Sequence, residues 1–83
     1  MDDQLDIDAA GAIHDRILKA ISDMRDAISK GQHFLALYKA AATQAERATF
    51  RHHFAQSHGE WEDAHNVCQL ARIDLRKLLD PPA

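Results

Sequence analysis

The sequence predicts an all-α protein, an antiparallel hairpin of two long helices that dimerises into a four-helix bundle. Apolar residues recur with a seven-residue period along most of the 83-residue chain, as they do in a coiled coil. The stripe that ends near residue 48 and the stripe that follows it are two residues out of phase, so one continuous helix cannot keep both on one seam. Strand signals are missing, because β-branched residues are few and no segment alternates between apolar and polar residues.

The first helix is expected over residues 8–42, with Asp8 as its N-cap, after an acidic arm at residues 1–7. Its heptad positions a and d are Ala10, Ile13, Ile17, Ala20, Met24, Ala27, Gly31, Phe34, Tyr38 and Ala41. A further apolar row, Ile21, Ile28 and Leu35, occupies the e positions. The stripe is therefore wider than one partner helix can cover.

The second helix is expected over residues 45–79. Its a and d positions are Phe50, Phe54, Ser57, Trp61, Ala64, Cys68, Ala71, Leu75 and Leu78. Thr43 and Glu46 have the spacing of a capping box, which places the turn between the two helices at residues 42–45. The prolines that follow Asp80 end the helix and leave a tail at residues 80–83. With the turn there, Gly31 and the stretch from Ser57 to Gly59 are expected to face each other.

An alternative fold breaks the first helix at Lys30 and Gly31 and gives a three-helix bundle. We prefer the hairpin, because the heptad register crosses Gly31 without a slip. The hairpin leaves the e row exposed, and this favours a homodimer. The side chains expected in the core seam and the interface are Ile17, Ile21, Met24, Ile28, Phe34, Tyr38, Phe50, Phe54, Trp61, Cys68 and Leu75. Among them, Trp61 is expected to be substantially buried.

Composition and charge argue against several classes of function. Ten basic and thirteen acidic residues give a net charge of -3, and no basic face with exposed aromatic residues suggests nucleic-acid binding. No apolar stretch approaches the roughly 18 to 20 residues that span a bilayer, so we expect no membrane insertion and a cytoplasmic location. The single cysteine, Cys68, cannot form an internal disulfide and is expected to be a small buried apolar residue. Ion pairs at i,i+4 are expected for Asp15 with Lys19 and for Asp26 with Lys30.

Histidine is the one residue type in excess, with six in the chain. His58, Glu62 and His65 follow one another at i, i+4 and i+7 and so share one helix face. Glu62 and His65 have the Glu-x-x-His spacing that di-iron carboxylate bundles use. The first helix contains no glutamate that could supply the remaining carboxylates. A metal site at these three residues is therefore the alternative interpretation.

The pattern as a whole indicates a non-enzymatic helical module for protein–protein interaction. We expect a small adaptor, chaperone or assembly factor that acts as a homodimer and binds an unidentified protein without a cofactor, which is an analogy at the level of the fold. No nucleophile with a neighbouring base and no glycine-rich phosphate loop is recognisable. The alternative is a metal-binding bundle that needs a second chain to complete its ligands.

Overall fold

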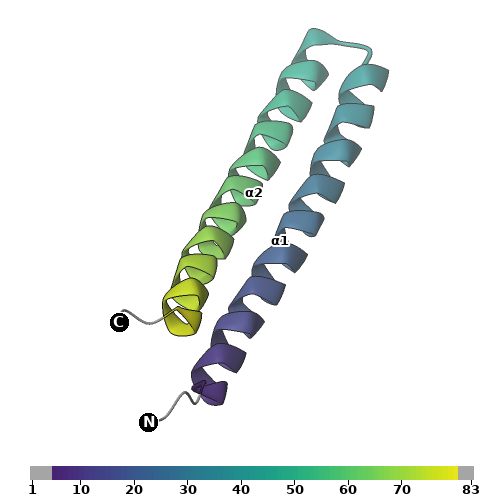
Figure 1. The fold of residues 1–83 in the computed structure, drawn as a ribbon. Coiled ribbons are helices and arrows are strands. Elements are labelled where there is room, and N and C mark those ends of the chain that lie inside the picture. The colour runs from purple at the N-terminus through teal and green to yellow at the C-terminus, as the bar shows by residue number, and fades with distance from the viewer. Residues whose placement is uncertain (1–4, 81–83) are drawn as a thin grey trace.

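The computed structural model, which describes residues 5–80, shows a hairpin of two long helices (Figure 1). Helix α1 spans Ile7–Ala40 and helix α2 spans Gln44–Leu79. The molecule measures 69 × 18 × 12 Å, and the far ends of the two helices lie side by side opposite the turn. The predicted all-α hairpin is confirmed. The three-helix alternative is wrong, since α1 continues through Lys30 and Gly31 without a break.

The start and end of α1 differ slightly from the prediction. Asp6, and not Asp8, is the N-cap: its carboxylate accepts a hydrogen bond from the Ala9 amide at 3.0 Å. Asp8 lies in the first turn of the helix, where its negative charge interacts favourably with the positive end of the helix dipole. The helix ends at Ala40, two residues before the expected end at residue 42, because Ala41 adopts an extended backbone.

The turn between the helices contains the predicted capping box. The Thr43 hydroxyl accepts a hydrogen bond from the Glu46 amide at 3.1 Å. The Glu46 carboxylate accepts a hydrogen bond from the backbone amide of Ala42 at 3.3 Å instead of from that of Thr43. The capping interaction therefore reaches one residue further toward the N-terminus. Helix α2 ends at Leu79 as predicted. The two prolines, and the aspartates of the acidic arm at residues 2 and 3, lie outside the described residues.

The centre of the helix–helix seam is made of small residues. The buried residues are Ala20, Ala27 and Gly31 of α1 and Ser57, Ala64, Cys68 and Ala71 of α2. In the described region no large side chain is fully buried, because the helices approach too closely to hold one between them. The one buried hydroxyl, on Ser57, donates to the carbonyl oxygen of His53 at 3.0 Å. The fold therefore leaves its large apolar side chains at the two edges of the seam.

Gly31 is buried in the seam, where it faces Phe54 and Ser57 of α2. A Cβ atom at this position would lie 3.4 Å from Cε2 of Phe54 and 3.9 Å from Cβ of Ser57. The prediction that Gly31 faces Ser57 is confirmed. The prediction does not extend to Gly59, where an added Cβ would meet nothing within 4 Å.

Replacing Gly31 by leucine tests this close approach. Gly31→Leu should lower the free energy of unfolding by about 1 to 3 kcal/mol, because its Cβ would already contact the Phe54 ring and its methyl groups would crowd that ring. Gly59→Leu is the matched control, and it should raise stability by up to about 1 kcal/mol through helix propensity alone. Urea denaturation of both variants at one protein concentration measures the difference. Equal effects at the two glycines would contradict the tight seam.

Candidate functional site

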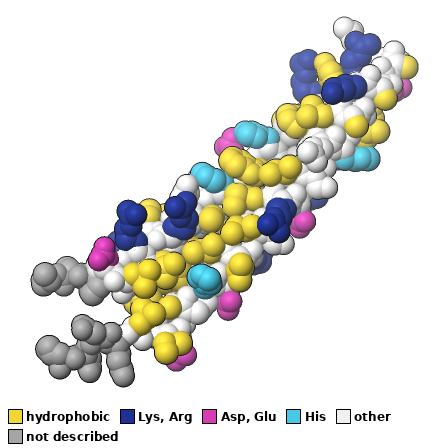
Figure 2. Space-filling model, turned by 45° about the vertical axis from the view of Figure 1, so that its right-hand side comes forward, with side chains coloured by type: hydrophobic (Ala, Val, Ile, Leu, Met, Phe, Trp, Pro, Cys, Tyr) yellow, Lys and Arg dark blue, Asp and Glu magenta, His cyan; other side chains and the backbone are white. Residues whose placement is uncertain are grey.

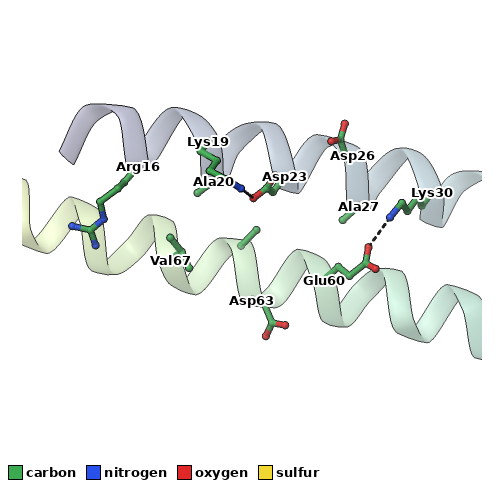
Figure 3. A pocket seen from close by; sticks show the side chains of 11 residues that line it. Arg16, Lys19, Ala20, Asp23, Asp26, Ala27, Lys30, Glu60, Asp63 and Val67 are labelled. Atoms are coloured by element: carbon green, nitrogen blue, oxygen red, sulfur yellow. Dashed lines mark hydrogen bonds and ion pairs between the residues drawn. The ribbon is translucent and has the colours of Figure 1, made fainter. Parts of the chain in front are cut away.

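One edge of the seam, formed by the g positions of both helices, is charged. Arg16 pairs with Asp74 and Lys30 pairs with Glu60, each at 3.2 Å across the two helices. Figure 3 shows Lys30 and Glu60 reaching toward each other across this edge, over a groove of about 570 Å³. We call this side the charged edge. Its charges are largely paired with one another, so the groove does not resemble a binding site for an ionic ligand.

The predicted ion pairs within α1 are not formed. Lys19 pairs with Asp23 at 2.9 Å and not with Asp15. Lys30 pairs with Glu60 of α2 and not with Asp26, whose side chain points away from α2 in Figure 3. The reason for the second difference is position: a g residue lies beside the opposite helix, which offers a partner that the sequence of one helix cannot reveal.

The other edge, formed by the a positions of both helices and the e positions of α1, is mostly apolar. Its side chains, here called the apolar face, are Ile17, Ile21, Met24, Ile28 and Leu35 of α1 and Phe54, Trp61 and Leu75 of α2. Ile28 keeps 50% of its surface exposed and Leu35 keeps 41%, and the other six are half-buried. Figure 2 shows hydrophobic side chains gathered in a band along the hairpin, with histidines beside it. Continuous apolar surfaces of this kind are common where proteins associate, and less common on the rest of a protein's surface.

A hollow of about 350 Å³ opens in the apolar face beside Gly31. The hollow forms where Gly31 has no side chain, and the apolar side chains of Ile28, Phe54 and Trp61 line it. Gln32 and His58 lie at its rim. A hollow of this shape can receive a large side chain of another helix, in the manner of knobs-into-holes packing.

The structure places the predicted seam residues mostly at the edges. Only Cys68 is buried, as expected for a small apolar residue, and Ile28 is exposed. The half-buried members are Ile17, Ile21, Met24, Phe34, Tyr38, Phe50, Phe54, Trp61 and Leu75. Trp61 was expected to be substantially buried. Because small residues fill the centre, its indole lies at the edge, stacked between the rings of His58 at 6.1 Å and His65 at 4.9 Å.

A second apolar row on α2, here called the outer row, lies away from the apolar face and was not predicted from the sequence. Its first member, Val67, lines the groove of the charged edge. Val67, Leu70 and Ile73 are exposed by 46%, 60% and 50%. They lie at positions g, c and f, which the heptad pattern treats as polar. The only sign of this row in the sequence is that three large apolar residues lie off the seam within about two turns of helix.

The three candidate metal ligands do not form a ligand set within one chain. Nε2 of His58 lies 2.7 Å from Oε1 of Glu62, and both side chains are more than half exposed. His65 has a different partner, because its Nε2 accepts a hydrogen bond from the side-chain Nε2 of Gln69 at 3.2 Å. Across residues 5–80, no three His, Cys, Asp or Glu side chains lie close enough to share a metal ion. A site here would need donors from a second chain.

Comparisons with known proteins add no identification. No protein family, curated protein or solved structure matches the chain. In the described part of the chain, neither helix contains a segment apolar enough to cross a membrane.

Metal binding at the histidine row has a direct test. Adding Zn²⁺, Mn²⁺ or Fe²⁺ to chelator-treated protein should leave the melting temperature unchanged, because one chain supplies too few converging donors. Differential scanning calorimetry together with elemental analysis of the purified protein measures this. A stoichiometric metal whose stabilisation is lost in Glu62→Gln or His65→Ala would contradict the expectation.

Proposed function

We propose that the chain is a non-enzymatic helical module for protein–protein interaction, which works as a homo-oligomer in the manner of a small adaptor, chaperone or assembly factor. The single observation that carries this proposal is the apolar face, which the hairpin leaves half-covered along its length. Soluble monomers rarely leave so long an apolar strip uncovered. A second layer of helices would bury the strip and complete a four-helix bundle.

The size of the chain's accessible surface also supports self-association. The chain exposes 6586 Å², whereas a compact monomer of 9.3 kDa exposes about 5,000 Å². The excess is about 1,600 Å² for each chain, or about 3,200 Å² for two. Obligate homodimers bury about 2,000 to 5,000 Å² in total, so covering the excess matches their range.

The arrangement of polar groups supports binding over catalysis. Apart from the buried Cys68, the titratable side chains of the described region are exposed or half-buried on the helix surfaces, and eight of them are paired with each other. Catalytic sites instead gather a few polar groups in a concave, largely apolar pocket. After self-association through the apolar face, the outer row of Val67, Leu70 and Ile73 would remain free for a different protein. The cytoplasmic location expected from the sequence stays a prediction.

A metal-binding bundle is the second candidate. The contact between His58 and Glu62 favours it, because it already brings two potential ligands together beside the apolar face. The remaining donors would come from the facing helices of another chain. The calorimetric test of metal binding separates the two candidates.

Sedimentation equilibrium tests the homo-oligomer. At micromolar concentration the mass should be at least twice 9.3 kDa, that is about 18.6 kDa for a dimer, because the apolar face needs a second layer. A monomer that unfolds cooperatively at this concentration would contradict the proposal.

Two isoleucines with the same exposure test which surface is used. Ile28 of the apolar face and Ile73 of the outer row each expose 50% of their surface in one chain. Ile28→Gln should destabilise the assembled protein by about 2 kcal/mol or more, because the face becomes buried between copies. Ile73→Gln is the matched control and should change stability by about 0.5 kcal/mol at most. Equal effects in thermal melts and sedimentation would refute an interface at the apolar face.

A further inference from the structure

Positively charged side chains border the apolar face. They occupy heptad positions a, b and e, which lie on or beside this face, and they are Arg25 and Lys39 of α1 and Arg47, Arg51, Arg72 and Arg76 of α2. We call these six residues the cationic rim. All six are exposed, and none of them forms an ion pair within residues 5–80. Figure 2 shows Lys and Arg side chains near both ends of the hydrophobic band.

Two hollows show that rim arginines lie directly beside apolar and aromatic side chains. Near the turn, Arg47 and Arg51 line a hollow of about 470 Å³ together with Tyr38 of α1. At the far end of α2, the last two rim arginines line a hollow of about 280 Å³ together with Leu75 of the apolar face. A molecule that covers the apolar face therefore also contacts the cationic rim.

The acidic side chains lie mainly on the other sides of the hairpin. Among the described acids, only Glu62 takes position b and none takes position a or e, and Glu62 is already in contact with His58. Asp8 and Asp15 are near the end of α2 but take position f, on the side of α1 turned away from the apolar face. Three of the four cations outside the rim are paired with acids. Unpaired positive charge is therefore concentrated beside the apolar face.

We propose that the apolar face docks an acidic amphipathic helix of another protein, whose carboxylates pair with the cationic rim. This inference rests on the proposed function, since the helix takes the place that a second copy occupies in the homo-oligomer. A second copy brings the same six cations on its own face and Glu62 as the one acid there, whichever direction it has. A helix with glutamates beside its apolar stripe complements both the apolar side chains and the rim.

The shape of the face favours a helix over a flat anionic surface. The hollow of about 350 Å³ beside Gly31 receives a single large side chain. An amphipathic helix presents such side chains at i, i+3, i+4 and i+7 and places them in pockets of the groove that binds it. A lipid surface has no fixed side chain to fill the hollow.

The net charge of -3 is compatible with an acidic partner, because the charges are unevenly distributed. The hairpin is 18 Å by 12 Å across its two short dimensions. Acids on the side opposite the apolar face therefore lie beyond the Debye length of about 8 Å from a helix docked on that face. The nearby cationic rim dominates the interaction.

The binding of two designed peptides tests the proposal. Both are helices of about 28 residues with leucine at a and d, and they differ only in carrying glutamate or lysine at e and g. Fluorescence anisotropy of a label on each peptide measures its Kd for the full chain. The glutamate peptide should bind at least about tenfold more tightly than the lysine peptide, because only its charges complement the rim. Sedimentation of the mixture should show complexes of one chain with the glutamate peptide.

Equal binding of the two peptides, or tighter binding of the lysine peptide, would overturn the acidic partner. Binding of the chain to vesicles of phosphatidylcholine and phosphatidylserine, without binding of the glutamate peptide, would overturn it in favour of a membrane surface. Sedimentation of the chain alone tests the homo-oligomer separately. A monomeric chain that still prefers the glutamate peptide would contradict only the homo-oligomer, and a monomeric chain that binds neither peptide would overturn both proposals.

Charge reversal on the rim locates the contact. In Arg72→Glu combined with Arg76→Glu, the ratio of the two Kd values should fall about tenfold, and this ratio cancels any competition from a second copy. Lys19→Glu combined with Lys77→Glu is the matched control, because it makes the same change of net charge at exposed c positions away from the apolar face. It should leave the ratio within about threefold of its original value. Equal changes in the two variants, with the helices retained by circular dichroism, would overturn docking at the rim.

Discussion

The close approach of two helices across a seam of small residues is the constraint on which the rest of this structure depends. Ala27, Gly31 and Ser57 leave no room for a large side chain between the helix axes. Contacts between the two backbones and their small side chains therefore fill the centre of the hairpin. The large apolar side chains lie at its edges. Because a single hairpin has two edges and only one layer, burying those side chains requires something outside the chain.

The two edges resolve this requirement differently. The charged edge closes with the pairs Arg16–Asp74 and Lys30–Glu60, which are half exposed and contribute little stability but are compatible with water. The apolar edge carries aliphatic and aromatic side chains, and these stabilise the protein only when they are buried away from water. The hairpin therefore has one polar edge and one apolar edge. The proposed self-association through the apolar face would use this difference between the two edges.

The heptad pattern, the phase break and the Thr43–Glu46 spacing were enough to predict the helices and the turn, because each depends on residues close in sequence. The position of Trp61 could not be predicted, since a heptad assigns a residue to the seam but does not show how closely two helices approach. That distance depends on Gly31 and Ser57 together, which are remote in sequence. Likewise, the partner of Lys30 lies on the other helix. Asp6 and Asp8 are both able to cap α1, and only the backbone geometry distinguishes them.

The most direct test of the account is whether the apolar face touches the same face of another chain in solution. A mixed dimer of isotope-labelled and unlabelled chains allows nuclear Overhauser contacts between chains to be observed separately. The account predicts contacts from the methyl groups of Ile21 and Ile28 in one chain to apolar-face side chains of the other. Contacts between chains that involve only the outer row of Val67, Leu70 and Ile73, or no contacts in a stably folded monomer, would contradict it.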